Sequence, residues 1–119
     1  MAETLLPQGI PFNPENGLRV RLGHKSATLG DNTTKLAPQD AQFQILTPSG
    51  GHRDVTLPAE EASQGLFFVI KNGAGATHKL IVKNDNTDEI DEIPHLAFGI
   101  FACDGSSWVS AVGAVTYAV

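Results

Sequence analysis

The sequence has little cysteine, no long apolar run and no cluster of positive charge. Its 119 residues contain one cysteine, Cys103, so no disulfide can form within the chain. The apolar neighbours Phe101 and Ala102 predict that this thiol is buried and structural. No apolar stretch approaches the ~20 residues of a membrane-spanning helix. The N-terminus lacks a basic segment followed by an apolar one, so we expect no secretion signal and synthesis in a cytoplasm.

Acidic residues outnumber basic ones, with 13 Asp and Glu against 8 Lys and Arg, for a formal net charge of -5. The lysines and arginines are scattered along the chain. A surface of this sign repels the phosphate backbone, which argues against sequence-independent binding of nucleic acid. We therefore expect neither a nucleic acid nor a membrane as a partner.

Turn-forming and strand-forming residues are abundant. Twelve glycines and seven prolines punctuate short segments in which apolar and polar residues alternate, the period of a half-buried strand. A chain of this length forms one domain. These features predict an all-β fold, an antiparallel β-sandwich or flattened barrel of about seven strands, with an extended N-terminal arm.

The stretch from residue 42 to residue 70 shows this pattern best. Phe43 and Ile45 share one face of an expected strand and Gln44 points the other way. The turn residues at 48–51 predict a hairpin that leads to the next strand. One short helical turn is expected over the segment that ends at Gly65. The apolar run that follows predicts a strand covered on both faces, which we expect to pair antiparallel with the strand that contains residues 80–82.

The N-terminal residues 1–17 are expected to form the arm, and residues 18–119 the domain. Prolines in this segment forbid a helix and disfavour a central strand. Its apolar side chains must lie either on their own domain or on another molecule. The candidates for contact with a partner are Leu5, Leu6, Ile10 and Phe12.

The C-terminal segment combines a turn signal with a lack of charge. Asp104-Gly105 between apolar segments is the strongest short-range hairpin signal in the chain. Trp108 is expected to cover the core while its indole N–H finds an acceptor. Residues 106–119 carry no charge, so they form a central strand or are covered by a neighbouring subunit. Val115 and Tyr117 are the candidate contacts there.

Residues that could support chemistry are few. Five carboxylates lie within eight residues, but a calcium loop would need glycine where Ile90 stands, so a solvated acidic loop competes with an ion site. The four histidines have no metal-ligand spacing, and no G-x-S-x-G motif is present. We expect no catalytic residue, no cofactor and no bound metal. The carboxylates are Asp85, Asp88, Glu89, Asp91 and Glu92.

Three short motifs give the chain a resemblance. They are Thr56-Leu57-Pro58, then Ile70-Lys71-Asn72, then Asp104-Gly105 followed by Trp108. Their order resembles small β-domains of bacteriophage structural proteins, both head decoration proteins and head or tail fibre domains. The match covers roughly residues 42–112, and its motifs are structural.

The resemblance implies a role in the virion. Fibre proteins usually carry long repetitive or coiled-coil shafts, and this chain has none, so we expect a decoration or cement protein. Such a protein would bind the major capsid protein on the capsid exterior, as a homo-oligomer and by analogy a trimer. A receptor-binding or short fibre domain is the alternative. A glycan hydrolase would need paired carboxylates in a cleft, which residues 85–92 do not supply by themselves.

Overall fold

The computed structural model describes residues 4–5, 11–13, 15, 17–18, 21–30, 33–74 and 77–114. In this part of the chain the helical structure is limited to one 3-10 turn, and no helix is long and apolar enough to cross a membrane. The elements are β1 (Thr4–Leu5), β2 (Pro11–Asn13), β3 (Gly17–Leu18), β4 (His24–Leu29), β5 (Thr34–Lys35), β6 (Phe43–Pro48), β7 (Arg53–Thr56), η1 (Glu60–Ala62), β8 (Phe67–Asn72), β9 (Leu80–Lys83), β10 (Glu89–Ile93), β11 (Ala97–Cys103) and β12 (Trp108–Ala114).

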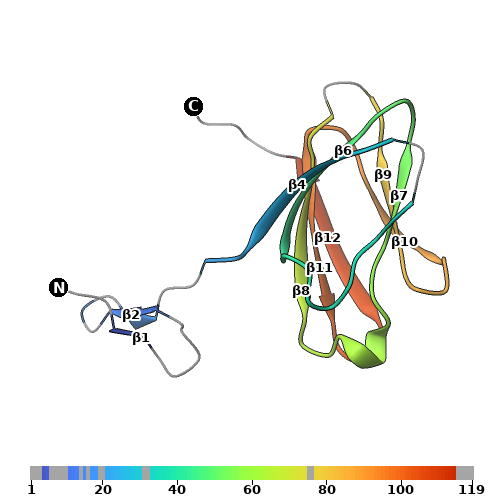
Figure 1. Cartoon of the computed structure of the whole chain (residues 1–119). Helices are drawn as coiled ribbons and strands as arrows, with labels where there is room; N and C mark the ends of the chain where they lie inside the picture. The colour runs from blue at the N-terminus through green and yellow to red at the C-terminus, as the bar shows by residue number, and fades with distance from the viewer. Residues whose placement is uncertain are drawn as a thin grey trace.

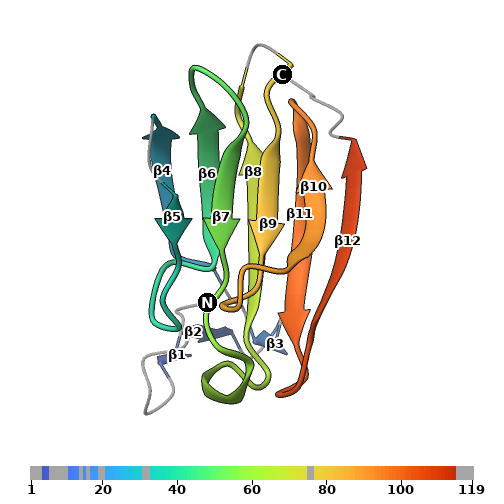
Figure 2. The same ribbon diagram turned by 90° about the vertical axis from the view of Figure 1, so that its right-hand side faces the viewer.

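The all-β prediction is confirmed, with the strands divided among three sheets. The larger two have the strand orders β12-β11-β8-β6-β4 and β10-β9-β7-β5. Figure 2 shows them as two layers, with the four-stranded sheet in front. Among the described strands, the third sheet, β1-β2-β3, has no pairing with the other two, and Figure 1 shows β1 and β2 apart from the two layers.

The expectation of an antiparallel sandwich or flattened barrel is wrong in two respects. Both large sheets are mixed, because β4, β6 and β8 run parallel, as do β5, β7 and β9. The sheets are also not closed into a barrel, since no backbone ladder among the described strands joins one to the other. The described strands form a five-stranded and a four-stranded sheet beside the small one, where about seven strands were expected.

The parallel pairing arises because the chain crosses between the layers after each strand from β4 to β8. The turn at 48–51 therefore does not make a hairpin: β6 and β7 lie in different sheets. The Arg53 guanidinium donates to the Ser49 carbonyl at 2.7 and 3.0 Å and holds this connection in place. The expected pairing of β8 with β9 is wrong for the same reason. Parallel neighbours need a long connection between them, and here the intervening strand of the other sheet supplies it.

The core between the layers is apolar and draws on both sheets. Phe68, Ile70 and Phe101 of one sheet and Leu80 and Val82 of the other are fully buried. In β6 the buried face is the opposite of the one expected: Gln44 points inward, and Phe43 and Ile45 are only half buried. The Gln44 side chain tolerates burial because its Nε2 donates to the Ala41 carbonyl at 2.7 Å.

Several local predictions are confirmed. Trp108 is buried in the core, and its Nε1 donates to the Pro58 carbonyl at 3.0 Å. Cys103 is buried, as its neighbours predicted. A tight loop at Asp104-Gly105 joins β11 and β12, which pair antiparallel. The 3-10 turn η1 lies where a helical turn was expected, and Gly65 beyond it has a φ of 80°.

Candidate interaction face

On β6, β8, β11 and β12 the outer face of the five-stranded sheet is built mainly from apolar side chains, whereas β4 contributes His24, Ser26 and Thr28 to it. Along β6, β8 and β11, buried residues alternate with half-buried or exposed ones, so the second set points away from the core. The strand register extends this set onto β12. We call the resulting surface the apolar face. It consists of Phe43, Ile45, Thr47, Phe67, Val69, Lys71, Phe98, Ile100, Ala102, Val109, Ala111 and Gly113.

The residues of the apolar face are continuous across the strands. Ile100 lies opposite Val69 of β8 on one side and Ala111 of β12 on the other. Among the described large apolar residues it is one of the most exposed, at 43%, and Val109 reaches 57%. Among the described positions of this face only Lys71 carries a charge. A contiguous apolar patch on a small acidic protein marks a contact surface.

The outer face of the four-stranded sheet is its opposite in character. Lys83 Nζ lies 2.9 Å from Asp54 Oδ2, and Lys79 Nζ lies 3.6 Å from Glu92 Oε2. Register places both pairs around Ile81. Half-exposed ion pairs of this kind add little stability, and they are typical of a face in contact with water. We call this surface, formed by Lys35, Asp54, Lys79, Ile81, Lys83, Glu89 and Glu92, the polar face.

The edge strands of the two large sheets also differ in how well they are protected against pairing with another chain. β5 is two residues long, and β10 carries three acids and a bulge between Glu89 and Asp91. β4 carries Lys25, which pairs in register with the inward-facing Gln44. Short length, charge, bulges and inward-pointing lysines all discourage pairing with another chain. β12 has seven residues and none of these devices, so the margin of the apolar face is also the least protected edge of the described sheets.

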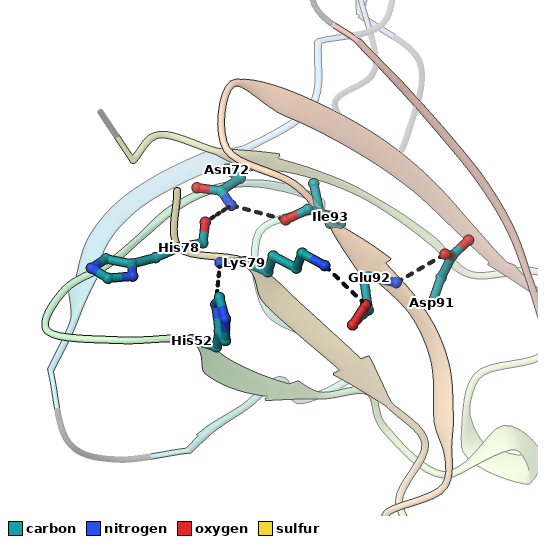
Figure 3. A network of polar contacts seen from close by, with 7 residues as sticks. All are labelled: His52, Asn72, His78, Lys79, Asp91, Glu92 and Ile93. Carbon is teal, nitrogen blue, oxygen red and sulfur yellow. Dashed lines mark hydrogen bonds and ion pairs between the residues drawn. The ribbon is translucent and has the colours of Figure 1, made fainter. Parts of the chain in front are cut away.

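A polar network ties the connections between the layers together at one end of the domain (Figure 3). Asn72, fully buried at the end of β8, donates through Nδ2 to the carbonyls of His78 at 3.0 Å and Ile93 at 2.9 Å. Its Oδ1 accepts the backbone N–H of Ala74 at 2.9 Å. One side chain therefore joins β8, β10 and the approach to β9, and every polar atom of its amide group has a partner.

Two histidines lie beside this network. The backbone N–H of Lys79 donates to His52 Nδ1 at 2.9 Å, so the neutral imidazole carries its proton on Nε2 (Figure 3). The ring of His52 meets that of His78 edge to face, with centroids 6.0 Å apart. These contacts order a loop. Within the described ranges no three His, Cys, Asp or Glu side chains come together as metal ligands would.

The acidic segment, residues 85–92, covers the turn between β9 and β10 and most of β10. Asp91 Oδ2 accepts the Ser110 hydroxyl at 2.9 Å, and Glu92 pairs with Lys79. These two carboxylates are thus engaged with protein groups on different sides of the strand. An open hollow of about 370 Å³ lies elsewhere, beside β5, and its lining is mostly apolar: Lys35, Leu36, Ala37, Pro38, Pro58, Ala59 and Ala62. It holds no pair of groups for acid and base catalysis.

The contact residues expected from the sequence are only partly described. Leu5 lies on β1, in register with Pro11, and Phe12 lies on β2 between Thr4 and Leu18. The backbones of these two candidates are therefore brought together in the small sheet. The remaining candidates, Leu6, Ile10, Val115 and Tyr117, lie outside the described residues. Their role in contacts with a partner stays a prediction.

The apolar face itself was not predicted as a site. One signal for it is present in the sequence: the run from Leu66 to Ile70 is apolar at every position, which indicates cover on both faces. The core covers one face, through Phe68 and Ile70. Phe67 and Val69 on the other face have no second layer among the described strands.

Comparison with known proteins provides no further guide. The chain matches no family model, no curated protein sequence and no solved structure.

Proposed function

We propose that this protein is a structural component of a bacteriophage virion, which binds the outer surface of the capsid and stabilises the lattice of the major capsid protein. The observation that carries the proposal is the asymmetry of the two layers. One outer face is charged and suited to water, and the other is apolar and suited to protein. A subunit of a capsid assembly needs an apolar surface that other protein covers and a charged surface that faces the solvent.

The mechanism would be mass action and requires no turnover chemistry. A protein that binds the assembled lattice, and not the free subunits, shifts the equilibrium toward assembly. At a free concentration 100 times its Kd this amounts to about 2.7 kcal/mol for each site. Many copies on one shell multiply the effect.

The two layers would be a β-sandwich, with residues 18–119 as the domain and residues 1–17 as an extended arm. The arm would reach the capsid through Leu5, Leu6, Ile10 and Phe12, while Val115 and Tyr117 would contribute to contacts between subunits. The protein would act as a homo-oligomer, a trimer in the resemblance, without a metal or cofactor.

Co-sedimentation with undecorated capsids of the same phage tests this function. We expect saturable binding and a higher melting temperature of the capsid. Deletion of residues 2–12 should abolish binding while the circular dichroism spectrum keeps its β-sheet form, because the domain core lies in other strands. Full-length protein that stays in the supernatant at micromolar concentration would contradict capsid binding. A deletion that binds normally but melts earlier would show that the arm only covers its own domain.

A receptor-binding or short fibre domain is the second candidate. The observation that favours it is the ordered loop region at one end of the layers, where His52 and His78 meet. Loops held by a rigid scaffold are common recognition surfaces. In this case the protein should bind host cells and not bare capsids, and the same sedimentation assay with whole cells separates the two functions.

A further inference from the structure

We infer that the apolar face is the contact between copies of this chain, so that the outer face of the five-stranded sheet is covered by other subunits. The inference deepens the proposed function: it rests on the homo-oligomer proposed there and is independent of capsid binding. Two or three copies could cover this face, two by stacking their sheets and three by surrounding a common axis.

Charge favours a second copy as the occupant. The chain carries a net charge of -5, so identical molecules repel each other over most of their surface. The acids of β10 and the ion pairs of the polar face lie on the other layer. The apolar face carries one charged residue, Lys71, near the end of β8. Two copies that meet through this face therefore bring almost no like charges together.

The area of the face suits an association of this kind. The four strands that carry the apolar face lie about 4.8 Å apart, and about six residues each at about 3.3 Å give roughly 380 Å² in flat projection. Two such faces give roughly 760 Å² in flat projection, and the relief of the side chains raises the accessible area toward the roughly 1,000 Å² that a specific interface needs. Single exposed apolar residues would not reach this size.

The relief of the face provides knobs and hollows. Ile100 and Val109 stand out from the surface, at 43% and 57% exposure. The small Ala111 lies on β12 opposite Ile100, and a Cβ built on Gly113 would meet no atom within 4 Å. Sheets that stack about 10 Å apart interdigitate large and small side chains in this way. Ile100 of one copy can therefore enter the hollow that the small residues leave on another.

Light scattering on the full-length protein and matched lysine variants tests the inference. From roughly 1 to 100 µM, a range that covers moderate affinities, we expect the wild type to be oligomeric. Ile100→Lys places an unpaired charge in the centre of the contact, and we expect at least about tenfold weaker association with an unchanged circular dichroism spectrum. Ile81→Lys is the control: it is the same substitution on the polar face, beside Asp54 and Glu92, and should stay oligomeric.

The outcomes decide the inference in either direction. If Ile100→Lys fails to fold, Val109→Lys takes its place, because the Val109 side chain is more exposed and at the margin of the sheet. A monomeric wild type, lysine variants that associate normally, or a control that dissociates equally would each overturn it. The capsid assay on the same samples separates the two proposals. A monomer that binds capsids refutes only the interface, and an oligomer that does not bind refutes only the function.

Discussion

Replacement of Trp108 by phenylalanine would test how much the packing of the Trp108 ring and its hydrogen bond to Pro58 contribute to the stability of the fold. Trp108 begins β12, where it pairs in register with Cys103, and its ring packs on Phe68 with centroids 6.0 Å apart. Its Nε1 reaches the carbonyl of Pro58, at the segment that leads into η1. The substitution keeps an aromatic ring in the core but removes the donor and part of the ring.

The cost can be estimated from these contacts. Removal of the buried donor deprives the Pro58 carbonyl of its indole partner, which costs about 1–3 kcal/mol. The smaller ring leaves unfilled space, and shape changes of this size in a core add roughly 1 kcal/mol. We therefore expect Trp108→Phe to lower the free energy of unfolding by about 2–4 kcal/mol, a fall in Tm of roughly 4 °C or more for each kcal/mol.

Urea unfolding followed by circular dichroism at one fixed protein concentration measures this change. Fluorescence cannot serve for the variant, because Trp108 is the chain's only tryptophan. Ser106→Ala, at an exposed position in the loop before β12, is the control and should change the free energy of unfolding by no more than ~0.5 kcal/mol. A loss below ~0.5 kcal/mol for Trp108→Phe would refute the reasoning, since the hydrogen bond to Pro58 would then contribute nothing to stability.

Three further predictions concern Gly99, the Asp104 carboxylate and the acidic segment. A Cβ on Gly99 would lie 2.8 Å from Cε1 of Phe101, so Gly99→Ala should cost about 1–3 kcal/mol in urea unfolding, whereas Gly30→Ala, in open space, should cost almost nothing. Backbone N–H groups of Ser106 and then Ser107 donate to the Asp104 carboxylate and lower its pKa below the ordinary 3.8. Its stabilising effect should therefore be complete above the ordinary pKa and lost as pH falls through the lowered one; a carboxyl titration by NMR with a midpoint above 3.8 would contradict this. Chelator treatment should leave the Tm within about 2 °C, and a larger fall would reveal an ion site in the acidic segment.

Local features of this protein could be predicted from the sequence because they depend on neighbouring residues. Asp104-Gly105 makes a tight connection wherever it occurs between strands, since the Asp104 carboxylate accepts two nearby backbone N–H groups and Gly105 takes a φ of 97°. The burial of Trp108 follows similarly from its size and its single donor. The all-β class follows from alternation and turn residues over the whole chain.

Strand partners and the choice of the buried face were decided by the tertiary structure. A turn at 48–51 is compatible both with a hairpin and with a crossing to another sheet, and only the packing of the two layers selects the crossing. In β6 the period of two separates Gln44 from Phe43 and Ile45 but does not say which set turns inward. The inward place of Gln44 depends on an acceptor at Ala41, and the outward place of Phe43 depends on its neighbour Val69 of β8. Alternation is a property of one strand, whereas burial depends on which other strands lie against it. The sequence therefore determined the strands. The tertiary structure alone decided that an apolar face would remain on the outside.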